Sequence, residues 1–141
     1  MLRYNRDKIS KLIFEMRKAL DRLDSIGKIK KEEFLNDPDK IDSAKYNFIV
    51  AIESAIDICN HIISQNGFRP PQDYADTFKV LAEQGILEDD FVNNLRNMVK
   101  FRNRLVHIYW EIDNEQIYLI LKNNIKDLKR LLDKIIEFIF C

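Results

Sequence analysis

Apolar residues recur along most of the chain at steps of three and four, the spacing that places them on one side of an α-helix. This pattern predicts four long helices and one shorter helix. The predicted helices cover residues 5–25, 42–65, 73–84 (the shorter one), 88–107 and 113–140. No internal repeat or linker interrupts them, so residues 1–141 are expected to form a single helical domain.

Residues suited to helix ends bound several of these segments. Asp42 or Ser43 is expected to cap the second helix, and Asp113 with Gln116 forms a possible capping-box variant at the start of the last. The connector before the second helix contains a proline and a possible helical turn at Lys31–Leu35. Polar connectors of this kind join neighbouring helices, which favours an antiparallel up-and-down arrangement.

Composition supports an all-α fold. The chain of 141 residues contains only three glycines and three prolines, too few for the many turns of an all-β fold. The apolar faces of the predicted helices are wide, and a homodimer would cover the surplus apolar surface. We therefore expect an all-α, antiparallel up-and-down bundle that dimerises.

Charge and cysteine content narrow the kinds of site that the chain can hold. The 23 basic and 23 acidic residues cancel, so any nucleic-acid site must be a local patch. The two cysteines, Cys59 and Cys141, match neither a disulfide framework nor a metal motif, and no metal site or cofactor is expected. The sequence shows no signal-like segment or apolar run of membrane-spanning length, so a cytoplasmic protein without a membrane partner is expected.

The fourth predicted helix has a charge on its apolar side. Its apolar stripe runs through Phe91, Leu95, Met98, position 102, Leu105 and Tyr109. Position 102 is an arginine, and an unpaired cation on a buried face is unfavourable. Arg102 therefore needs an anion, a water-filled cleft or a partner subunit.

A second face of the same helix is basic and ends in a histidine. It comprises Arg96, Lys100, Asn103, Arg104 and His107. Histidine is suited to proton transfer near neutral pH, and arginine donates paired hydrogen bonds to phosphate. Together they provide a proton shuttle and a fixed charge for phosphodiester cleavage, without a metal ion.

Structural explanations exist for the same residues. Basic residues at the end of a helix often only complement its dipole, and a single histidine there often caps or packs. Tyr109 and Trp110 are aromatic residues, which often pack in a core or an interface. Five residues also separate Arg102 and His107 by about 140° around a straight helix. The two side chains converge only if the helix ends or distorts near residue 106, or if a second subunit contributes.

The segment from Arg102 to Tyr109 resembles the R-x4-H-x-Y motif of HepT toxins, a branch of the HEPN superfamily. Residues 51–63, 70–74 and 112–113 are also similar to that family, in the same order along the chain. The resemblance implies a dimeric helical bundle in which the arginine and histidine of both subunits meet in one cleft. It also implies a metal-independent RNase, in which the ribose 2′-OH attacks the adjacent phosphate.

Individual roles follow from this resemblance. His107 would move the proton, Arg102 would hold the phosphate and Asn103 would orient the reacting group. Asp57 and His61, one turn apart on the second helix, are candidate supports, or else a polar pair at a bundle seam. Lys100, Arg104 and Arg96 are candidate RNA contacts.

The resemblance also implies an antitoxin partner. Toxins of this family pair with a minimal nucleotidyltransferase that adds AMP to the motif tyrosine, which is Tyr109 here. An added phosphate beside the catalytic pair would block the cleft. The alternatives are a non-catalytic subunit that binds nucleotide or docks the nucleotidyltransferase, and a purely structural dimer.

Overall fold

The computed structural model describes residues 2–108 and 111–140, and its regular elements are all helical. The helices are α1 (Arg6–Gly27), α2 (Lys31–Leu35), α3 (Pro38–Gln65), α4 (Tyr74–Glu83), α5 (Asp89–His107), α6 (Asn114–Asn123) and α7 (Ile125–Phe140). No strand occurs within the described ranges. The predicted all-α class is thus confirmed for the part of the chain that the structure describes.

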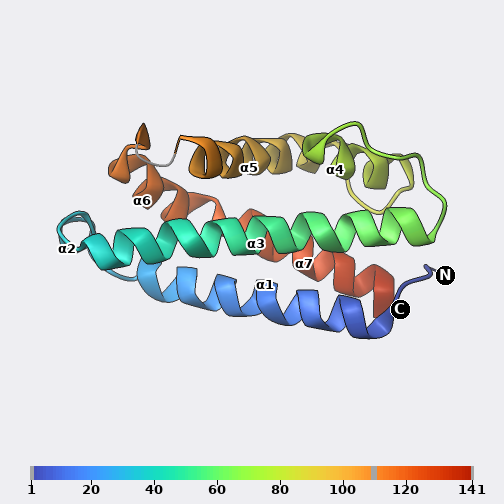
Figure 1. The fold of residues 1–141 in the computed structure, drawn as a ribbon, viewed down its shortest axis with the longest axis horizontal. Helices are drawn as coiled ribbons and strands as arrows, with labels where there is room; N and C mark the ends of the chain where they lie inside the picture. Colours follow the sequence, from blue (N-terminus) through green and yellow to red (C-terminus); the bar gives the residue numbers. More distant parts are fainter. Residues whose placement is uncertain (1, 109–110, 141) are drawn as a thin grey trace.

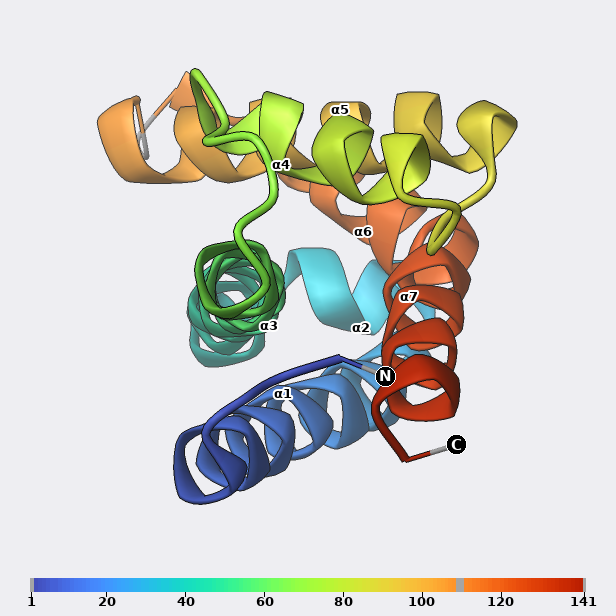
Figure 2. The same cartoon turned by 90° about the vertical axis from the view of Figure 1, so that its right-hand side faces the viewer.

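The four long helices alternate in direction along the chain. Helices α1 and α3 lie side by side and antiparallel, and α5 and α7 continue the up-and-down order (Figure 1). Viewed along the bundle, α4 and α5 form a layer over α3 and α7, with α1 on the opposite side (Figure 2). The predicted apolar stripes fill the space between the helices, so that α3 is in contact with all six other helices of the described ranges.

Helix α3 begins four residues earlier than predicted. Asp37 caps it by accepting a hydrogen bond from the Lys40 main-chain N–H (3.2 Å), and Pro38 occupies the first helical position. The predicted cap at Asp42 or Ser43 is therefore wrong. Proline suits the first turn because its missing N–H would have no helical acceptor there, and this property identifies Pro38 as a start signal.

The predicted helix over residues 113–140 is two helices, α6 and α7. The chain leaves the helical path at Asn124, whose N–H donates to the Ile120 carbonyl, and α7 starts at the next residue. Asparagine is a weak helix former, and two occur together at this point. Asp113 caps α6 through the Glu115 N–H (2.9 Å), not through the predicted pairing with Gln116. The short turn at Lys31–Leu35 is confirmed as α2.

The segment before α1 is attached to the end of α3 by side chains. Asn66 accepts from the Arg3 N–H (2.7 Å) and donates to the Arg3 carbonyl (2.9 Å). The imidazole Nε2 of His61 accepts from the Asn5 N–H at 2.8 Å, which requires the neutral ring. Partial burial, together with the nearby Lys8 ammonium, lowers the pKa of His61 below its usual 6.5.

None of the helices in the described ranges is both long and apolar enough to span a membrane.

Packing between α3 and α5 sets the position of the helix that carries Arg102. Phe48 is fully buried and meets Phe101 edge to face, with ring centroids 5.1 Å apart. We predict that Phe48→Ala lowers the free energy of unfolding by about 3–5 kcal/mol, because it empties a core site. Phe14→Ala on α1, where the side chain is 62% exposed, should change it by less than about 0.5 kcal/mol. Urea unfolding checks both, and equal losses would contradict this account of the core.

The His61 contact predicts a pH dependence in the acidic range. Because the folded pKa lies below the unfolded one, the contribution of His61 to stability is present above about pH 6.5 and is lost as pH falls through the lowered value. NMR should show the Asn5 amide signal shifting with the His61 ring as it titrates below 6.5. The chain has two histidines, so His107→Ala assigns the ring signals. A His61 midpoint at or above 6.5 would contradict the prediction.

Candidate active site

Arg102 lies on the core-facing side of α5 and is paired with a carboxylate. Its side chain is 14% exposed, and Glu53 of α3 accepts from both Nε (3.1 Å) and Nη2 (2.6 Å) through one oxygen, Oε1. The charge that interrupts the apolar stripe is therefore balanced within the chain. Glu53 was missed by the sequence analysis, although it lies between Ile52 and Ile56, at the edge of the apolar face of α3.

Two further contacts fix the plane of the guanidinium. Arg102 Nη1 donates to Asn103 Oδ1 at 3.0 Å, and the guanidinium carbon lies 5.3 Å from the centroid of the Tyr74 ring. Tyr74 is the first residue of α4 and was also missed by the sequence analysis. An arginine has five N–H groups, and these hydrogen bonds use three of them. Two N–H groups therefore remain for an anion that enters the site.

Asp57 shares the hollow in which Arg102 lies. This hollow, of about 120 Å³, is lined by Glu53, Ile56, Asp57, Tyr74 and Arg102. Burial raises the pKa of Asp57, and the Glu53 carboxylate one turn away raises it further, against smaller opposing effects of Lys8 and Arg102. The hollow thus combines a fixed cation with a carboxyl group whose proton affinity is increased.

His61 lies in a different hollow from Arg102. It faces a polar space of about 640 Å³ between α1 and α3, which Asp57 also lines. Its Nε2 is engaged by the Asn5 main chain, and no hydrogen bond joins it to Asp57. The structure thus brings Asp57, but not His61, to Arg102.

His107 does not meet Arg102 within the described chain. Helix α5 continues without a break to His107, so the two side chains leave it about 140° apart. Of the two predicted alternatives within one chain, the distortion near residue 106 does not occur, and α5 ends only after His107, which is still part of the helix. His107 is exposed, whereas Arg102 faces the core. Asn103, one turn before His107, lies on the flank between them.

The predicted basic face divides between two sides of α5. Lys100 and Arg104 line a shallow hollow of about 200 Å³ against α6, turned away from Arg102, and Arg96 is half-buried closer to the start of the helix. Among the residues that the structure describes, none of the three forms an ion pair. Their charges are therefore open to a polyanion.

Two further sequence predictions concern groups around this site. Tyr109, the expected AMP acceptor, lies outside the described residues. Within the described ranges, no group of three or more His, Cys, Asp or Glu side chains is arranged to hold a metal ion.

Comparison with known proteins identifies the family. A family model described as ribonuclease HepT-like matches residues 16–135. The mRNA nuclease HepT of Shewanella oneidensis is 32% identical over 94 residues, which make up 67% of this chain and 71% of that protein.

Solved structures share the fold. A tri-AMPylated HEPN toxin of Shewanella oneidensis, in complex with MNT antitoxin, has a TM-score of 0.83 at 28% identity, covering 92% of this chain and 96% of that one. The cytosolic protein YutE of Bacillus subtilis has a TM-score of 0.82 at 19% identity, covering 98% and 92%, and so shares the fold. With the family model matching most of its length, this chain belongs to the HepT-like ribonucleases.

Proposed function

We propose that this protein is the toxin of a toxin–antitoxin pair. It is a cytoplasmic, metal-independent endoribonuclease that acts as a homodimer and is silenced when a minimal nucleotidyltransferase antitoxin adds AMP to Tyr109. The observation that carries the proposal is the guanidinium of Arg102, which is held on three sides and keeps two N–H groups for a phosphate. Family membership with ribonucleases supports the reaction type.

The reaction is an internal transesterification of RNA. The ribose 2′-oxygen forms a bond to the adjacent phosphorus, and the bond from phosphorus to the 5′-oxygen of the next nucleotide breaks. His107 takes the 2′-OH proton and passes it to the departing 5′-oxygen, which leaves as a hydroxyl, so the imidazole returns to its neutral form and a 2′,3′-cyclic phosphate remains. Arg102 stabilises the charge that grows on the phosphoryl oxygens, and Asn103 and Asp57 orient the group. Arg96, Lys100 and Arg104 contact the flanking RNA backbone, while His61 supports the site through the N-terminal segment.

A second copy of the chain completes the site. Since Arg102 and His107 leave α5 in different directions, the cleft needs the histidine of the other subunit beside this arginine. An exposed apolar side chain, Val106, lies one turn after Arg102 on the surface where that copy would pack and is 42% exposed. Tyr46, two turns before Glu53 on α3, is 61% exposed and extends this surface.

AMP addition accounts for silencing in electrostatic terms. Tyr109 follows His107 by two residues. Transfer joins the tyrosine oxygen to the α-phosphorus of ATP and releases pyrophosphate. The modified side chain carries a negative charge that competes with the RNA phosphate for Arg102 and fills the cleft. The similar HEPN toxin of Shewanella oneidensis is itself tri-AMPylated and bound to MNT antitoxin.

Single substitutions test the chemistry. Arg102→Ala and His107→Ala should each reduce the rate of RNA cleavage by at least about 100-fold, because each removes one half of the acid–base and charge apparatus. Arg17→Ala, an exposed arginine on α1, serves as the matched control and should leave cleavage unchanged. Cleavage measured in EDTA should persist and yield cyclic phosphate ends. Unchanged cleavage by His107→Ala would contradict the mechanism, and nucleotide binding by a wild-type protein that cuts no RNA would favour the non-catalytic subunit.

Mixing the two inactive variants tests the shared cleft. Arg102→Ala and His107→Ala subunits, co-expressed with different tags and purified as mixed dimers, should regain cleavage, because one intact arginine and one intact histidine can then meet. If the two variants are instead mixed in equal amounts without purifying the mixed dimers, about half of the dimers are mixed. Each mixed dimer has one working site where the wild type has two, so the rate should be on the order of a quarter of the wild-type rate. Mixed dimers as inactive as either parent would rule out a site shared between subunits.

Intact mass tests the modification. The protein co-expressed with its nucleotidyltransferase should gain mass in steps of one AMP, and Tyr109→Phe should abolish the gain because it removes the acceptor oxygen. Tyr118→Phe, which alters a buried tyrosine, is the control and should keep it. Steps of AMP mass that survive Tyr109→Phe would place the acceptor elsewhere.

A further inference from the structure

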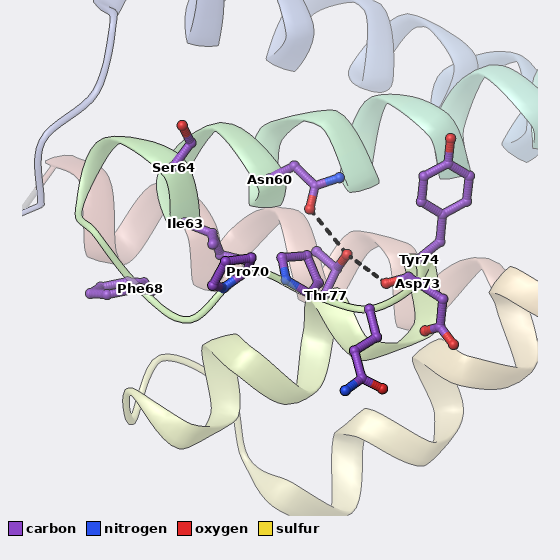
Figure 3. Close-up of a pocket in the computed structure, with 10 residues that line it drawn as sticks. Asn60, Ile63, Ser64, Phe68, Pro70, Asp73, Tyr74 and Thr77 are labelled. Atoms are coloured by element: carbon purple, nitrogen blue, oxygen red, sulfur yellow. Dashed lines mark hydrogen bonds between the residues drawn. The ribbon is translucent and has the colours of Figure 1, made fainter.

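A groove of about 570 Å³ adjoins the Arg102 hollow. One wall is α3, with Asn60 and Ile63, and the other is the Pro70-Pro71-Gln72 loop that leads into α4 (Figure 3). Tyr74 lines both this groove and the Arg102 hollow, so the two spaces meet at its ring. None of the residues proposed to act in catalysis lines the groove.

The loop wall of the groove is held in place by an ionic clamp. Both terminal nitrogens of Arg69 bind the Asp76 carboxylate (2.7 and 3.1 Å), and Glu83 accepts two further bonds from the same guanidinium. Asp76 also accepts from the Gln72 main-chain N–H at 2.9 Å. These bonds lower the pKa of Asp76 to about 2, so the clamp stays charged at neutral pH. The groove is therefore shaped before any ligand arrives.

The amide of Asn60 is oriented into this space. The fully buried Thr77 hydroxyl donates to Asn60 Oδ1 at 3.1 Å, with the Asp73 carbonyl as a second acceptor at 3.4 Å. The nitrogen points toward the Tyr74 side (Figure 3). Among the residues that the structure describes, no acceptor is within hydrogen-bonding distance of that nitrogen. An amide donor in a groove lined by both apolar and polar side chains is suited to a hydrogen bond with the edge of a planar polar ligand.

We propose that this groove binds one nucleobase of single-stranded RNA, that of the nucleotide whose phosphate lies on Arg102. The inference rests on the proposed function, because it takes RNA to be the ligand of Arg102. The groove offers what an unstacked base requires: flat apolar and aromatic surfaces for its faces and an amide donor for its edge. Tyr74 joins the two spaces through its contact with the guanidinium, so that base and phosphate of one nucleotide bind on either side of its ring.

Binding and cleavage with the full-length chain test the subsite. The four ribonucleoside 3′-monophosphates and ribose 5-phosphate, which lacks a base, are titrated into the ¹⁵N-labelled protein. The nucleotides should bind at least about 10-fold more tightly than the sugar phosphate, because stacking adds to the phosphate contact. Asn60→Ala and Tyr74→Ala should remove most of this advantage, whereas Tyr74→Phe, which keeps the ring, should retain it.

Controls separate the groove from the catalytic step. Asn93→Ala, an exposed asparagine on the outer side of α5, should leave binding unchanged. In RNA cleavage, the Asn60 and Tyr74→Ala variants should raise KM more than they lower kcat and should change the base preference next to the cut. Equal binding of nucleotide and sugar phosphate, or variants without effect on either readout, would overturn the proposal. A wild-type protein that binds nucleotides through the groove but cuts no RNA would overturn the proposed function and leave the subsite standing.

Discussion

Arg102 can carry a permanent charge on the core-facing side of α5 because Glu53 meets it from α3. The cation is 14% exposed and the carboxylate 42%, so the pair lies at the edge of the core with one side open to solvent. Removing either partner would leave the other charge without compensation at the edge of the core. Under the proposed function, the open side would let an incoming phosphate share the guanidinium with Glu53. The contact that balances the charge of Arg102 would then also orient it for a ligand.

The sequence alone was sufficient to find Arg102 but not its partner. Arg102 stands out because its position in the apolar stripe of one helix conflicts with its charge, and that conflict is visible locally. Glu53 lies 49 residues away and ends up beside it only through the packing of α3 against α5. Helical periodicity assigns a residue to a face, but it does not tell which face of another helix it meets. Tyr74 was missed for the same reason, since its role depends on where the loop from α3 places the start of α4.

Residues near the helix ends were sufficient to predict most of these ends from the sequence. The ends that were predicted wrongly also have local causes. Pro38 reads as a breaker inside a polar connector, but as the first residue of a helix it continues the chain into α3. The apolar stripe across residues 113–140 continues through Asn124, so its periodicity conceals a break that depends on backbone propensity. The angle between Arg102 and His107 followed directly from helix geometry, and the uninterrupted α5 retains it. The apolar and polar pattern of one chain does not determine which residues a second subunit brings to the site.

Helix α3 lines both the Arg102 hollow and the adjoining groove. Glu53, Asp57, Asn60 and Ser64 follow one another at steps of four, three and four, and so form a line along its outer face. The first two residues line the Arg102 hollow, and the last two line the groove beyond Tyr74. In a chain without net charge, long-range attraction contributes little to RNA binding. Under the proposed function, affinity would therefore come from short-range contacts along one surface, and this line of polar residues, with Tyr74 between its two halves, would provide them.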